Sequence, residues 1–198
     1  DWSSDVSSSD LVTVLLAHPR LSHQLLETPP AKATALETLV RRQIERTKVF
    51  DGEPAIAHQV TLPTKNAQGV LVHLFPKPLL DTMVASAEKT GFHLTAVLPP
   101  TAVLEAQLPS LPLGKDEVAL IAAETGSLTT MLVGRPDGQV MLGRAIDATR
   151  VQGGSGLGVD LNRTLLFASQ QFGTNVGSIW LFGPGASQRA AELQGRSE

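Results

Sequence analysis

The chain has 198 residues and a formal net charge of −3, with 42% hydrophobic and 18% charged residues. This length suits one compact domain or two small ones, and the composition is that of a folded globular protein. The weak negative charge gives no basic field for nucleic acid or anionic lipid, and the absence of Tyr leaves few aromatic surfaces for base stacking. The absence of cysteine excludes disulfides, thiolate nucleophiles and zinc–thiolate sites.

Membrane insertion and secretion signals are also missing from the sequence pattern. No stretch reaches the roughly 18 consecutive apolar residues that a transmembrane helix needs. The first ten residues are acidic and serine-rich, which is the wrong chemistry for a signal peptide. Because the chain does not begin with Met, we expect it to be a piece of a longer protein.

The first hundred residues contain short apolar runs and two amphipathic helical patterns. Alternating or β-branched apolar runs indicate strands, and apolar residues at every third or fourth position indicate helices. The predicted strands cover residues 11–17, 21–26, 55–62, 70–75 and 93–98, and the predicted helices cover residues 34–46 and 78–90. We therefore expect the order β-β-α-β-β-α-β, with the strands in a single layer and both helices on one face.

Turn and capping signals set the expected ends of these elements. His18-Pro19 is a turn signal, so we expect the first two strands to form a hairpin. Thr34-Ala35-Leu36-Glu37 matches a capping box at the start of the first helix. Gly91 stands where a glycine ends the second helix.

The second half predicts three strands, a helix, a strand and a last helix. The strands cover residues 118–123, 129–133, 140–144 and 178–182, with tight turns at Thr125-Gly126 and Pro136-Asp137-Gly138. Asp160 or a neighbour is expected to cap a helix that carries Leu161, Leu165, Ala168 and Phe172, and Ser187 to cap the last helix. This order, β-β-β-α-β-α, predicts a mixed sheet with helices packed against it.

Two segments without a regular pattern link these elements. Residues 101–115 contain proline and a mixed pattern, so we expect them to connect two lobes. Gly153-Gly154-Ser155-Gly156 lies between a strand and a helix, where a glycine-rich loop can bind an anion at the helix N-terminus. No lysine follows it as in a phosphate-binding loop, and Asp160 already supplies negative charge there, so we favour a flexible connector.

The order of elements resembles the ribonuclease H-like core, two copies of which form an actin-like ATPase. In the first half, the residues that carry a closer resemblance are Leu11–His18, Leu25–Pro30, Leu36–Arg46, Ala57–Val60 and Leu80–Val97. They are similar to the PilM family of type IV pilus assembly and to its relative, the cytoplasmic part of GspL in type II secretion. In the second half, Leu120–Thr130, Gly138–Ile146 and Ile179–Ala186 resemble the second phosphate turn, the strand after it and the adenosine-side turn.

The resemblance implies a mixed α/β (α+β) fold of the actin-like, ribonuclease H-like type. It implies an incomplete version with two small lobes, each a mixed sheet with packed helices. Residues 11–100 resemble subdomain 1C, residues 101–116 form the connection, and residues 117–195 resemble subdomain 2A without subdomain 2B. The first phosphate turn of the family is expected to lie outside this chain.

A weak nucleotide-binding site follows from the same resemblance. Its candidate residues are Glu124, Gly126, Ser127, Thr129, Thr130, Gly183 and Gly185. The turn at Gly126 can offer backbone N–H groups to an anion, or it can be a hairpin that needs a positive φ, and we favour the hairpin. Glu124 stands where the family has a metal-facing Asp, and its extra methylene would push the carboxylate toward the phosphate or metal position.

From these departures we expect no catalytic residue, no metal site and no cofactor, with ATP and magnesium as the alternative. The five histidines are His18, His23, His58, His73 and His93. They lie on predicted strands or turns, and no two of them have the spacing of a helical metal-ligand pair.

The resemblance implies a non-catalytic scaffold that is cytoplasmic and peripheral to the inner membrane. PilM-type proteins hold a short N-terminal peptide of a membrane partner in a groove between subdomains 1C and 1A, so the expected partner is a PilN-like or GspM-like segment. The candidate surface lies near residues 11–26 and 80–87. The alternatives are an ATP-binding actin-like protein whose first phosphate loop lies outside this chain, and a GspL-type module that docks an assembly ATPase.

Overall fold

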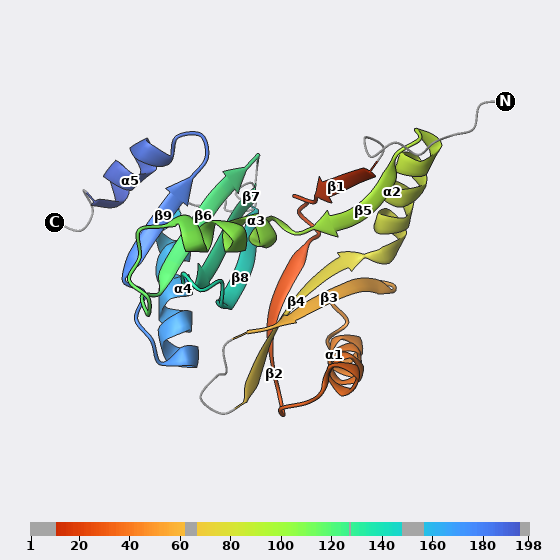
Figure 1. Ribbon diagram of the computed structural model, residues 1–198, viewed down its shortest axis with the longest axis horizontal. Helices are drawn as coiled ribbons and strands as arrows, with labels where there is room; N and C mark the ends of the chain where they lie inside the picture. The colour runs from red at the N-terminus through yellow and green to blue at the C-terminus, as the bar shows by residue number, and fades with distance from the viewer. Residues whose placement is uncertain (1–10, 62–66, 127, 148–156, 195–198) are drawn as a thin grey trace.

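The computed structural model describes residues 11–61, 67–126, 128–147 and 157–194 (Figure 1). Its elements are β1 (Leu11–Leu15), β2 (Ser22–Thr28), α1 (Ala33–Thr47), β3 (Pro54–Val60), β4 (Gln68–Pro76), α2 (Lys77–Lys89), β5 (His93–Leu98), α3 (Pro100–Gln107), the short 3-10 helix η2 (Leu108–Ser110), β6 (Ala119–Thr125), β7 (Leu128–Gly134), β8 (Val140–Asp147), α4 (Leu157–Phe172), β9 (Ser178–Phe182) and α5 (Ala186–Gln194). The predicted orders β-β-α-β-β-α-β and β-β-β-α-β-α are both confirmed. None of these described helices is long and apolar enough to cross a membrane.

The described strands form three sheets. β1 and β5 make a two-stranded parallel sheet, and β2, β4 and β3 make a three-stranded antiparallel sheet in that order. The third sheet has the order β8-β7-β6-β9, with β9 parallel to β6 and the other pairs antiparallel. The expected β1–β2 hairpin and the expected single layer in the first half are therefore wrong. A turn signal is local, whereas a parallel pair such as β1–β5 is closed by a long crossover that no local signal reveals.

Helix α1 covers one face of the three-stranded sheet. Its residues Leu36, Val40 and Ile44 pack against the alternate residues of β4 that share one face of the sheet, Val70, Val72 and Leu74. The helix begins at Ala33 after Lys32, and no side chain caps its first turn. The capping box is thus wrong, because Thr34 already lies inside the helix.

The opposite face of β4 carries Leu71, His73 and Phe75. Phe75 packs with Leu16 and Leu21 beside α2, so the two helices lie on opposite faces of this strand rather than on one. The strand is buried along almost its whole length. A continuous apolar run of this kind belongs to a strand that is covered on both faces.

The second half packs helices against both faces of its four-stranded sheet. On one face, α4 contributes Leu161 and Ala168 to a cluster with residues of β6, β7 and β8. On the other face, α3 and η2 contribute Leu104 and Leu108. The segment expected to be a plain connection therefore forms a packed helix. Pro100 is its first residue, a position where the missing proline N–H costs nothing.

The two halves share one core. Leu71 of β4 belongs to the same cluster as Ile121 and Leu132 of the second half. Gly143 of β8 makes this approach possible, because a Cβ there would lie 3.2 Å from Leu71 Cδ2 and 3.1 Å from Thr101 Cγ2. Leu25 of β2 also packs against the second half. Strands from both halves thus meet without an intervening layer.

Helix and turn ends agree with the sequence in part. Gly91 follows α2, Gly173 follows α4, and Gly138 lies in the β7–β8 hairpin, as predicted. The expected caps Asp160 and Ser187 are wrong, because α4 begins at Leu157 and α5 at Ala186, which places both residues inside a first turn. The loop Gly153–Gly156 and Ser127 lie outside the described residues.

Candidate functional site

The structure brings two of the predicted turns together at one edge of the four-stranded sheet. β6 and β9 are parallel neighbours with Ala123 opposite Phe182, so Glu124 and Gly183 follow their strands side by side. Gly183 has φ +110°, and a Cβ on it would lie 3.0 Å from the Glu124 carbonyl oxygen. The carboxyl ends of adjacent parallel strands are a common position for ligand sites in α/β sheets.

Glu124 is already paired at this edge. Its Oε1 atom forms an ion pair with Nη1 of Arg189, and the side chains are 19% and 43% exposed. Arg189 lies near the start of α5, and its backbone N–H donates to the Gly185 carbonyl, 3.1 Å away. The guanidinium therefore neutralises the carboxylate that the resemblance places toward a metal or phosphate. Arg189 is not among the residues predicted for this site, and the only sequence signal for it is its position one helical turn after Gly185.

The two threonines of the predicted site point to opposite faces of β7. Thr129 pairs with Glu124 and shares its face, whereas Thr130 pairs with Ala123 and faces the other way. Both are buried, and among the described residues the Thr130 hydroxyl has no hydrogen-bond partner. Only Thr129 thus shares the face of the Glu124 carboxylate.

Gly126 needs its glycine for conformation rather than for space. It has φ +61°, and a Cβ there would meet nothing within 4 Å. This is what the turn of a tight hairpin requires. Ser127, the next residue of the predicted site, is not among the described residues, and nucleotide binding at this edge stays a prediction.

An apolar groove lies between the two sheets of the first half. Its volume is 150 Å³, and its lining comes from the β1–β2 connection, β5 and α2 on one side and from β3 and β4 on the other. The lining residues are Leu16, Leu21, Ala55, Ile56, Ala57, His73, Leu74, Phe75, Leu80, Val97, Leu98 and Pro99. No acidic residue, lysine or arginine is among them. Leu16, Leu21 and Leu80 belong to the surface, near residues 11–26 and 80–87, that is predicted from the sequence to bind a partner.

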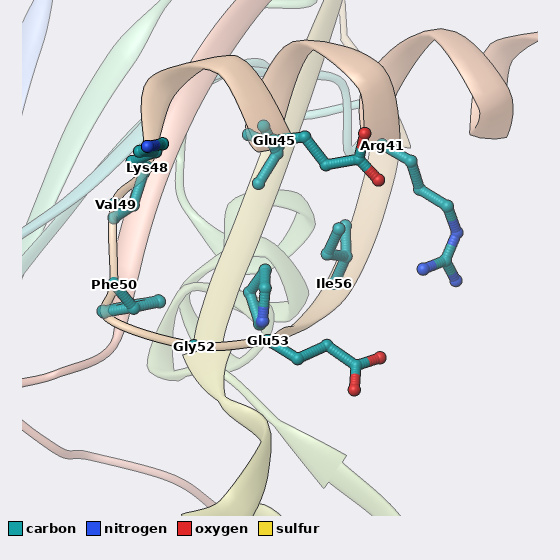
Figure 2. Close-up of a pocket in the computed structure, with 10 residues that line it drawn as sticks. Arg41, Glu45, Lys48, Val49, Phe50, Gly52, Glu53 and Ile56 are labelled. Carbon is teal, nitrogen blue, oxygen red and sulfur yellow. The ribbon is translucent and has the colours of Figure 1, made fainter.

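A second hollow, of 280 Å³, lies between α1 and β3 (Figure 2). Apolar side chains line it at Val49, Phe50 and Ile56, and charged side chains of both signs line it at Arg41 and Glu53 among others. The mixed charges give it no preference for an anion or a cation. It therefore provides weaker grounds for a binding site than the groove does.

His23 and His73 form a buried pair beside the groove. They are register partners on β2 and β4, and their Nδ1 atoms are 2.7 Å apart. Burial lowers the pKa of His23 to about 3, helped by His73, and burial lowers the pKa of His73 to about 4. The described parts of the chain contain no group of three His, Asp or Glu side chains placed to hold a metal ion. Because both pKa values lie well below 7, the two imidazoles are neutral at pH 7.

Comparison of the sequence with known proteins assigns no family to this chain, but its structure is similar to several solved structures. No family model matches it, and no curated protein matches it significantly. A chain of the PilM–PilN type IV pilus biogenesis complex superposes with a TM-score of 0.73 at 17% identity, covering 94% of this chain. A Bacteroides thetaiotaomicron protein of unknown function with an actin-like ATPase fold has a TM-score of 0.54 at 12% identity over 93% of this chain.

The cytoplasmic domain of EpsL, an inner membrane component of the type II secretion system of Vibrio cholerae, has a TM-score of 0.51 at 21% identity over 90% of this chain. The chain spans only 66%, 63% and 65% of the lengths of these three structures, in the order given. It has the actin-like ATPase fold. The mixed α/β, actin-like fold predicted through the resemblance to PilM and GspL is thus confirmed.

Proposed function

We propose that this chain is a non-catalytic scaffold on the cytoplasmic side of an inner membrane, in an assembly of the type IV pilus or type II secretion kind. In this proposal it binds the cytoplasmic segment of a PilN-like or GspM-like membrane protein. The observation that carries the proposal is the uncharged groove between the β1–β5 sheet and the β2–β4–β3 sheet. Its support from the comparisons is the likeness to a chain of a PilM–PilN complex and to the EpsL cytoplasmic domain.

The chemistry of the groove favours a short aliphatic segment. Three leucine side chains offer apolar surface to it: Leu16 and Leu21 from the β1–β2 connection, and Leu80 from α2. Burying one leucine-sized side chain there would contribute about 1.5–3 kcal/mol to binding. An extended segment fits this geometry, because it can place alternate side chains into a groove while its other side chains stay in water.

The absence of catalysis in this proposal rests on the pairing of Glu124. A carboxylate that helps to hold Mg²⁺ must be free to coordinate it, yet this one is engaged by Arg189. The ion pair is intrinsic to the chain, since α5 follows directly after the turn that carries Gly183 and Gly185. In this proposal Arg189 balances the charge of the Glu124 carboxylate at this edge of the sheet, so no bound metal or nucleotide is required there.

The proposal is tested by isothermal titration of the chain with the N-terminal cytoplasmic peptide of the PilN-like or GspM-like protein from the same organism. Ala57 lines the groove, so Ala57→Glu should weaken binding by at least tenfold by placing a charge in apolar surroundings. Val60, on the same strand and 55% exposed, lies outside the groove, so Val60→Glu is the matched control. Equal effects of the two substitutions, or no binding by the full-length protein, would refute the proposal.

A second candidate function is ATP binding, favoured by the close approach of the two glycine turns at Glu124 and Gly183. It requires a first phosphate loop from outside this chain. ATP with Mg²⁺ should then raise the melting temperature of the full-length protein, and Glu124→Ala should abolish the shift. An unchanged melting temperature would leave the scaffold as the better account.

A further inference from the structure

The largest of the three described hollows lies between the two halves of the molecule and shares one lining residue, Leu21, with the groove. Its volume is 670 Å³, within the usual range for small-ligand sites. One wall comes from the β1–β2 connection and the loop after α1, and the other wall comes from Arg144 and Ala145 of β8. A molecule bound there would contact both halves at once.

Positive charge predominates around this cavity. The described residues that line it include two arginines, Arg20 and Arg144, and one carboxylate, Asp51. Arg144 also lies near Asp160, but Nη2 and Oδ1 are 3.9 Å apart, beyond hydrogen-bond distance, and Asp160 is shared with Arg163 at 3.8 Å. One aspartate between two arginines does not neutralise both.

Arg144 is held in place for binding an anion. Its Nη1 donates to the buried Thr164 hydroxyl, 3.3 Å away, while its side chain remains 35% exposed. A guanidinium whose position is fixed by one hydrogen bond loses little freedom when its other N–H groups bind an oxyanion. Arg20 is exposed on the opposite wall, so the two arginines can approach one ligand from two sides.

Apolar side chains complete the cavity. Leu21, Val49 and Phe50 line it on the side of the first half. Figure 2 shows Val49 and Phe50 on the loop after α1, where they also line the hollow beside that helix. A ligand for this cavity therefore combines an oxyanion with a flat or apolar body.

We propose that the cavity between β8 and the β1–β2 connection is a binding site for a small organic anion, a phosphate or carboxylate carried on an apolar or aromatic body. Arg20 and Arg144 bind the oxyanion, and Phe50 with Leu21 contacts the body. Because its walls come from both halves, the ligand stabilises their arrangement. The site shares Leu21 with the groove, and none of its lining residues belongs to the glycine turns.

The test is titration calorimetry with four probes: inorganic phosphate, AMP, benzoate and adenosine. AMP should bind more tightly than phosphate, which lacks the body, and more tightly than adenosine, which lacks the charge. Binding of benzoate in place of AMP would identify a carboxylate as the preferred oxyanion. Arg20→Gln and Arg144→Gln should each weaken the preferred probe by about tenfold or more.

Arg163→Gln is the matched control, since Arg163 contacts the same Asp160 yet lies outside the cavity, and it should change affinity by less than about twofold. Thermal unfolding of each variant shows whether it is folded. No heat from any charged probe at millimolar concentration would overturn the proposal. Equal losses of affinity in Arg163→Gln and Arg144→Gln would also overturn it. So would a loss of affinity in Gly183→Ala while Arg20→Gln binds normally, because that result would place the anion at the glycine turns.

Discussion

Gly183 and Gly185 are neighbours in one turn, yet the structure gives them different surroundings. Both have a positive φ, but a Cβ at Gly183 would lie 3.0 Å from the Glu124 carbonyl oxygen, whereas a Cβ at Gly185 meets nothing within 4 Å. Glycine is thus required at position 183 both for its positive φ and for lack of space, whereas at position 185 it is required for its positive φ alone. The absence of a Cβ at Gly183 lets this turn lie close to the backbone of Glu124.

This difference predicts unequal costs of substitution. Gly185→Ala should lower the free energy of unfolding by about 1 kcal/mol, because alanine is strained at positive φ. Gly183→Ala should cost about 1–3 kcal/mol more, because the new methyl group meets backbone atoms that cannot rotate away. Urea denaturation of the two variants measures both values. Equal costs would mean that the turns do not press against each other.

The His23–His73 pair predicts a dependence of stability on pH. The pKa values of about 3 and about 4 in the folded protein lie below the ordinary value of 6.5, so between these limits the unfolded chain binds more protons. The free energy of unfolding should therefore fall by up to a few kcal/mol as the pH drops from about 6.5 toward 4, and the loss should level off below the folded pKa values.

Denaturation at several pH values measures this slope. The double variant His23→Gln/His73→Gln should lose the part of the slope that the pair contributes. His93→Gln removes an exposed histidine on β5 and should leave the slope as it is. If the double variant kept the full slope, other groups would be responsible for it.

Elements were easier to predict than their partners. The helices α1, α2 and α4 and all nine described strands follow from apolar spacing, since burial of one face imposes a period on the sequence. Pairing depends on residues far apart in the chain, so β1 was expected beside β2 although it pairs with β5. The prolines around α3 indicate a loop in the sequence, whereas Pro100 in fact begins the helix.

Contact between β8 and β4 gives a prediction at the scale of elements. Gly143→Ala should lower the free energy of unfolding by about 1–3 kcal/mol, because its methyl group would meet Leu71 and Thr101 at 3.1–3.2 Å. Leu71→Ala is destabilising alone but makes room for that methyl group. In a double-mutant cycle, Gly143→Ala should therefore cost less in the Leu71→Ala background. Additive costs would show that the two strands do not press together there.

For the molecule as a whole, the fold was predicted through the resemblance, and the site only in part. The sequence order placed the Glu124 and Gly183 turns on strands of one sheet, and the structure makes those strands neighbours. The sequence order does not indicate that Arg189 pairs with Glu124, because an ion pair between residues 65 positions apart depends on how α5 packs back against the sheet. The groove could not be predicted from the sequence either, because it lies between two sheets whose strands are predicted to form a single layer.

The groove is the proposed binding surface of the whole molecule. The most direct measurement is a ¹⁵N NMR titration of the protein with the N-terminal cytoplasmic peptide of its PilN-like or GspM-like partner. We predict that the largest shift changes fall on backbone amides of the groove, at Ala55, Ala57, Val97 and Leu98. Changes confined to the Gly126 and Gly183 turns, or a spectrum that the peptide leaves unchanged, would contradict this proposal.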